Sequence, residues 1–136
     1  MRIAIVDDEQ TIRMVAQVQL KLIEGALQPE DEVIVYSDPE SFLKAFTENP
    51  KDYFSIAVID HDLGEGKLSG YDLMNIMFKE NFSGVTVLFT STESQLSEEK
   101  ATLNQGVYFV NKINIENPKV PYEQLATLLQ KARNKE

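Results

Sequence analysis

Two kinds of hydrophobic pattern alternate along the chain. Short, continuous runs of apolar and often β-branched residues are typical of buried strands. Between them lie longer stretches in which apolar residues recur about every 3.6 positions, the period of an amphipathic helix. We expect five strands, at residues 2–6, 33–36, 54–59, 85–89 and 107–110.

A helix is expected after each strand. Ser37 or Asp38 can cap the second helix, and Pro39 suits its first turn. The fourth helix is unusually polar, because only three of its residues can be buried. The expected helices run from Thr11 to about Gly25, from Pro39 to Asn49, over 71–79, over 93–105, and from Pro121 onward. Strands that are apolar throughout and alternate with helices indicate an α/β fold with a parallel sheet covered on both faces.

Composition narrows the classes of function. The sequence has no cysteine and a single histidine, His61, which excludes disulfides, thiolate zinc sites and multi-histidine metal sites. The net charge of −9 disfavours direct binding to nucleic acid, which requires clustered Lys and Arg. No apolar run approaches the ~20 residues of a membrane span, and the first ten residues do not resemble a signal peptide. We therefore expect a cytoplasmic protein.

Polar residues follow the strands at their carboxyl ends. Asp7 and Asp8 follow the first strand, Asp60 the third, Thr90 the fourth, and Lys112 the fifth. In a doubly wound parallel sheet these ends meet at one edge, where ligands bind. Clustered carboxylates repel one another and require a cation, and hard oxygen ligands favour Mg²⁺. The pattern predicts a carboxylate that accepts a phosphoryl group, beside Mg²⁺ and a lysine that binds a phosphoryl oxygen.

These motifs resemble the receiver domain of bacterial two-component response regulators over almost the whole chain. The resemblance rests on IAIVDDE, on IDHDL with Asp60 and Leu63, on Gly70 and Asp72, on VLFTS with Thr90, and on YFVNK with Phe109 and Lys112. It implies a flavodoxin-like, doubly wound five-stranded parallel sheet with strand order 2-1-3-4-5 and five helices. It also implies a single receiver domain over residues 1–136 without an output domain, similar to a chemotaxis regulator.

By the same resemblance, Asp60 is the phospho-acceptor. Asp7, Asp8, Asp60 and the backbone carbonyl of Asp62 would bind Mg²⁺, and Lys112 would contact the phosphoryl oxygens. Thr90 and Phe109 would form the switch that changes a surface on helix 4, strand 5 and helix 5. The chain would catalyse only its own phosphotransfer and dephosphorylation.

The implied partners are a sensor histidine kinase or histidine phosphotransfer protein and a downstream protein target. A phosphorylation-dependent dimer is also compatible with the resemblance. Neither nucleic acid nor a membrane is an expected direct partner.

Asp60 is preferred over Asp62 as the acceptor because it directly follows the last buried residue of its strand. Asp62, two residues further into the loop, and Thr92 are expected to set the lifetime of the phosphoryl group. His61, adjacent to Asp60, is expected to point elsewhere. Two departures from the family stand out. Ile113 replaces the usual proline after Lys112, so a trans bond is expected, and Glu65-Gly66-Lys67 lengthens the loop after Asp60.

Two other functions fit parts of the pattern. The chain could be a degenerate receiver that binds partners without being phosphorylated. DHDLG also resembles the motif of haloacid-dehalogenase-type phosphatases, with Asp60 as nucleophile and Asp62 as acid and base, but that motif usually lies on the first strand.

Overall fold

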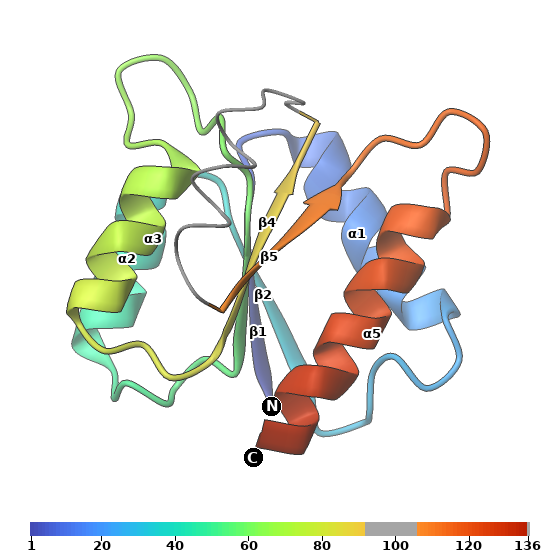
Figure 1. The fold of residues 1–136 in the computed structure, drawn as a ribbon, viewed down its shortest axis with the longest axis horizontal. Helices are drawn as coiled ribbons and strands as arrows, with labels where there is room; N and C mark the ends of the chain where they lie inside the picture. The colour runs from blue at the N-terminus through green and yellow to red at the C-terminus, as the bar shows by residue number, and fades with distance from the viewer. Residues whose placement is uncertain (92–105, 136) are drawn as a thin grey trace.

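Five parallel strands form one sheet in the order β2-β1-β3-β4-β5 (Figure 1). The computed structural model describes residues 1–91 and 106–135. The strands are β1 (Arg2–Val6), β2 (Glu32–Tyr36), β3 (Ile56–Ile59), β4 (Val85–Thr90) and β5 (Val107–Asn111). The described helices are α1 (Gln10–Leu22), α2 (Pro39–Glu48), α3 (Gly70–Lys79) and α5 (Val120–Lys135).

The expected fold class and strand order are confirmed. Four of the five expected helices lie in the described part of the chain, whereas the helix expected over 93–105 and Thr92 lie outside it. The first helix ends earlier than expected. It stops at Leu22, because the N–H of Ala26 bonds to the carbonyl of Ile23 and Gly25 adopts a positive φ of 78°. The third strand begins at Ile56 rather than at residue 54.

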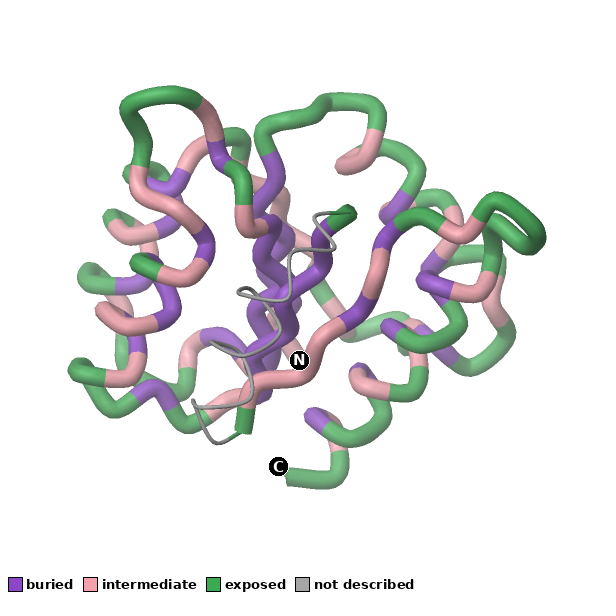
Figure 2. Tube along the Cα trace, turned by 45° about the horizontal axis from the view of Figure 1, so that its top comes forward, coloured by how far each residue is buried: buried purple, intermediate pink, exposed green. Residues whose placement is uncertain are grey.

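The sheet separates two apolar layers. α1 and α5 cover one face and α2 and α3 the other (Figures 1 and 2). The central strands β1, β3 and β4 are buried along most of their length, whereas the edge strands β2 and β5 are mostly half-buried. Because side chains alternate along a strand, successive residues enter opposite layers. Ile5 and Val58 pack in the α1/α5 layer, whereas Val6 and Ile59 pack in the α2/α3 layer. This alternation fixes the direction of every polar residue that follows a strand.

Local hydrogen bonds fix where two helices begin at the carboxyl edge of the sheet. Asp38, rather than Ser37, caps α2, because its Oδ1 accepts the N–H of Ser41 at 2.7 Å. α3 begins with a capping box in which the Ser69 hydroxyl accepts the N–H of Asp72 and the Asp72 carboxylate accepts the N–H of Ser69. The acid two residues after Gly70 therefore has a structural role in starting α3. No helix in the described ranges is both long and apolar enough to cross a membrane.

Candidate functional site

The side chain of Lys112 joins two buried carboxylates at the carboxyl edge of the sheet. Its Nζ lies 3.0 Å from Asp7 Oδ2 and 3.0 Å from Asp60 Oδ2. Asp7, Asp60 and Lys112 are only 1%, 4% and 6% exposed. Buried charges are rare unless they are paired. The arrangement is therefore a site in which each charge depends on the others.

Strand alternation explains why these side chains meet. Ile5 of β1, Val58 of β3 and Val110 of β5 all point into the α1/α5 layer. Asp7, Asp60 and Lys112 each follow one of them by two positions, so their side chains point to the same side of the sheet. β1 and β3 are neighbours, which brings the two carboxylates together, and the long side chain of Lys112 reaches them across β4.

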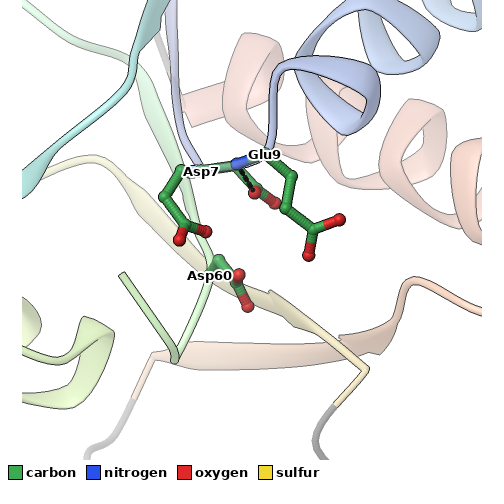
Figure 3. Close-up of side chains that lie close together, drawn as sticks. Asp7, Glu9 and Asp60 are labelled. Carbon is green, nitrogen blue, oxygen red and sulfur yellow. Dashed lines mark hydrogen bonds between the residues drawn. The ribbon is translucent and has the colours of Figure 1, made fainter. Parts of the chain in front are cut away.

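Two further acids complete the cluster. Carboxylate oxygens of Asp7, Asp8, Glu9 and Asp60 lie within 4.8 Å of one another. Glu9 directly precedes α1, and its backbone N–H donates to Asp7 Oδ1 at 2.9 Å. Figure 3 shows Asp7, Glu9 and Asp60 gathered around a common space, with this hydrogen bond as a dashed line. Glu9 Oε1 is also 3.9 Å from Lys112 Nζ.

The charges shift the pKa values of Asp7 and Lys112. Burial is the main reason that the pKa of Asp7 is raised, and repulsion from Asp60 adds to it, against the lowering effects of the Glu9 N–H and of Lys112. For Lys112, burial alone would lower the pKa, but attraction to Asp60 and Asp7 outweighs it and raises the pKa. Lys112 is therefore firmly protonated, whereas one lysine does not fully compensate the carboxylates around it.

One buried oxygen of the site has no hydrogen-bond partner among the described residues. Asp60 Oδ1 is buried and accepts no hydrogen bond from the described residues, whereas Asp60 Oδ2 is bound by Lys112. A buried carboxylate oxygen without a donor is costly. The site also holds carboxylate oxygens of Asp7, Asp8 and Glu9, which are the ligands that hard divalent cations such as Mg²⁺ prefer. The residues present thus fit a divalent cation.

Gly70 holds the loop after Asp60 close to the strand. Its N–H donates to the carbonyl of His61 at 2.8 Å, and a Cβ at this position would overlap the carbonyl oxygen of Asp60. Only glycine allows this approach. Gly70, the first residue of α3, therefore fixes the backbone that bears Asp60.

Thr90 and Phe109 lie on the other face of the sheet. Thr90, 1% exposed, is the last residue of β4 and follows Leu88 of the α2/α3 layer by two positions. Phe109 pairs with Leu88 in register and packs against the same layer. Thr90 therefore lies at the same carboxyl edge of the sheet as Asp60 and Lys112. Its backbone carbonyl accepts the N–H of Lys112 at 3.2 Å. The switch role of this pair stays a prediction.

Asp62 does not belong to the cluster found among the described residues. It is exposed, and its Oδ1 accepts the N–H of Gly64 at 3.2 Å. The contrast with the buried Asp60 supports the choice of Asp60, although the acceptor role itself stays a prediction. His61 is half-buried, and its Nδ1 is buried without a hydrogen-bond partner in the described part of the chain.

Three contributors to the site were missed by the sequence reasoning. Glu9 joins the carboxylates, and Arg13 donates from Nη1 to the carbonyl of Asp7 at 2.7 Å. The pKa of Tyr122 of α5 is raised mainly by burial, with smaller opposing effects of Lys112 and Asp7. The run Asp7-Asp8-Glu9 could have indicated Glu9 from the sequence, but no sequence pattern marks Arg13 or Tyr122 as part of the site. The bond between Lys112 and Ile113 is trans, as expected, because the described residues contain no cis peptide.

The fold matches solved structures over nearly their whole length. A CheY-like response regulator receiver domain protein from Methanospirillum hungatei is 24% identical, with a TM-score of 0.71, and the match covers 99% of this chain and 98% of that one. A response regulator receiver protein from Pseudoalteromonas atlantica is 19% identical, with a TM-score of 0.77 and coverage of 99% and 98%. The chain has the receiver-domain fold.

A receiver domain from Clostridium thermocellum gives a similar match, with 20% identity, a TM-score of 0.72, and coverage of 98% of this chain and 94% of that one. No protein-family model matches the sequence, and no curated protein does so either. At these identities the match concerns the receiver fold, so the chemistry has to be argued from this chain's own residues.

Replacing Gly70 tests how tightly the loop is held against Asp60. We expect Gly70→Ala to lower the free energy of unfolding by at least about 2 kcal/mol, because the added Cβ displaces the Asp60 carbonyl. Gly66→Ala is the matched control, since its Cβ would meet open space and only the positive φ of 75° causes strain, about 1 kcal/mol. Denaturant unfolding measures both. Equal losses would contradict the close approach at Gly70.

Proposed function

We propose that the chain is a phospho-accepting receiver in which Asp60 takes a phosphoryl group from a phosphohistidine of a partner protein. The observation that supports this most directly is the state of the Asp60 carboxylate. Oδ2 is held by Lys112, whereas Oδ1 is buried, unpartnered in the described part of the chain, and surrounded by further acids. The solved structures that share this fold are response regulator receivers, which supports the same phospho-accepting role.

In the proposed transfer, Asp60 Oδ1 attacks the phosphorus of the donor. A P–O bond forms while the P–N bond breaks, and the electron pair of that bond returns to the imidazole of the donor, which takes up a proton. The product is an acyl phosphate on Asp60. Lys112 is already held at the carboxylate and would offset part of the negative charge that the phosphoryl oxygens bring. Preorganisation of this kind lowers the barrier without a rearrangement during transfer.

Asp7, Asp8, Asp60 and the backbone carbonyl of Asp62 would hold Mg²⁺ in this proposal. When bound, the ion supplies charge neutralisation at the phosphoryl oxygens. Glu9 is a further acid at the rim of the same cluster.

Dephosphorylation would proceed by attack of water on the phosphorus. The P–O bond to Asp60 breaks, inorganic phosphate leaves, and the Asp60 carboxylate is restored. Asp62 is exposed two residues beyond the acceptor, in the loop that borders the site. It is thus suited to influence how water approaches, and so to set the lifetime of the signal.

The signal would leave the site through Thr90 and Phe109. Thr90 ends β4 beside the acceptor strand, and Phe109 lies partly buried on the same face of the neighbouring strand. A hydrogen bond from Thr90 to the phosphoryl group would shift the packing around Phe109, and with it a surface that a downstream target or a second copy reads.

Exposed apolar side chains beside the site support a protein rather than a small molecule as the donor. α1 begins three residues after Asp7, and the β5–α5 loop follows Lys112 directly. All exposed large hydrophobic residues of the described chain lie on these two segments: Met14, Val15, Val18, Leu22, Ile113 and Ile115. Such clustering is typical of interaction surfaces. A sensor histidine kinase or a histidine phosphotransfer protein is the proposed donor.

Incubation with acetyl phosphate and Mg²⁺ tests the proposal. Intact mass spectrometry should find one phosphoryl group on the wild type and none on Asp60→Asn, because the amide cannot act as the nucleophile. A wild type without label would favour a receiver that binds partners without phosphorylation. Continuous turnover of a phosphomonoester would favour a phosphatase instead.

The variant Asp62→Asn tests whether Asp60 or Asp62 is the phospho-acceptor. We expect this variant to be labelled as fully as the wild type, since Asp62 is exposed and lies outside the carboxylate cluster of the described residues. The half-life of its phosphoryl group should differ from that of the wild type, measured by intact mass after acetyl phosphate is removed. Loss of labelling in Asp62→Asn would overturn the choice of Asp60.

A further inference from the structure

The inserted segment Glu65-Gly66-Lys67 forms an exposed turn between Asp60 and α3. Gly64 and Gly66 have positive φ angles of 112° and 75°, and the N–H of Lys67 donates to the Gly64 carbonyl at 3.2 Å. A hollow of about 310 Å³ lies in this loop, lined by His61, Asp62, Leu63, Gly64, Lys67 and Ser69. The turn brings Lys67 back towards the strand ends.

The side chain of Lys67 lies across Gly64 from the carboxylate cluster. The position that a Cβ of residue 64 would take is 3.4 Å from Lys67 Cγ and 4.0 Å from Asp8 Oδ2. Because Gly64 has no side chain, nothing at this position separates the lysine stem from Asp8. The flexible four-carbon stem of a lysine allows its ammonium to turn to either side.

In the structure the ammonium of Lys67 pairs with an acid outside the carboxylate cluster. Its ammonium pairs with Glu40 of α2, with Nζ 3.6 Å from Oε1, and the two side chains are 47% and 55% exposed. Ion pairs so exposed are weak and easily exchanged. In contrast, four carboxylates surround Lys112 among the described residues, and even with the proposed Mg²⁺ bound a phosphoryl group would leave the site with excess negative charge.

We infer that Lys67 is a second cation of the site, which Glu40 holds aside and which a phosphoryl group on Asp60 attracts across Gly64. This inference rests on the proposed phosphorylation of Asp60. Once there, the ammonium pairs with a phosphoryl oxygen and covers the open side of the loop through which water approaches. Lys67 thereby prolongs the life of the acyl phosphate, and Glu40 shortens it by competing for the same ammonium.

The test compares Lys67→Met with Glu40→Gln. Each chain is phosphorylated with acetyl phosphate and Mg²⁺, the donor is removed, and the half-life of the phosphoryl group is followed by intact mass. Lys67→Met should shorten the half-life about threefold, and Glu40→Gln should lengthen it by a similar factor of about three, as expected from exposed charge pairs. Removing a merely structural ion pair would change both half-lives in the same direction.

Two controls sharpen the comparison. Lys51→Met removes another exposed pair, Lys51–Glu80 at 2.9 Å, at the opposite edge of the sheet, and should leave the half-life unchanged. The double variant Glu40→Gln/Lys67→Met should behave as Lys67→Met alone, because Glu40 acts only through Lys67.

The outcomes distinguish this inference from the proposed function. If the wild type is labelled but the two single variants change together, or neither changes, the role of Lys67 is overturned while phosphorylation stands. If the double variant behaves as Glu40→Gln alone, Glu40 does not act through Lys67 and the inference fails as well. A wild type that takes up no phosphoryl group overturns both.

Discussion

The ammonium of Lys112, held between Asp7 and Asp60, is the contact on which the site depends. Two carboxylates on adjacent parallel strands would repel each other if they were buried alone. A cation placed 3.0 Å from both offsets part of this repulsion at the edge of an apolar core. Such buried ion pairs contribute little to stability, because desolvation offsets the attraction. Their presence at the edge of the sheet is in keeping with the phosphoryl transfer that we propose.

The residues proposed for phosphoryl transfer and those proposed for the switch lie on opposite faces of the sheet. The charged groups lie on the α1/α5 side, because each follows a residue of that layer by two positions. Thr90 and Phe109 lie on the α2/α3 side, beside Leu88. Thr90 and Lys112 share a backbone hydrogen bond at the end of β4. In the function that we propose, a change at Asp60 would reach the opposite face at this point.

Strand alternation made much of the site predictable from sequence. Apolar runs located the strands. The residues directly after three of them gave Asp7, Asp60 and Thr90, and Lys112 lies two residues after the fifth. Strand alternation could not reveal contacts that depend on the path of a loop. Examples are the contact of Gly70 with the Asp60 carbonyl and that of Lys67 with the space beside Gly64. Each contact is made through a loop rather than within one strand or one helix, so neither the strand period nor the helix period indicates it. Arg13 and Tyr122 were also missed, because helix periodicity indicates a buried face but not which polar group lies beside it.

Beryllofluoride, a mimic of the phosphoryl group, tests the central claim most directly. In the presence of Mg²⁺, its addition to the wild type should shift the amide NMR signals of Asp60 and its neighbours, and those of Thr90 and Phe109 on the other face. Asp60→Asn should show none of these shifts. An unchanged wild-type spectrum, or the same shifts in Asp60→Asn, would contradict the account of Asp60 as the acceptor.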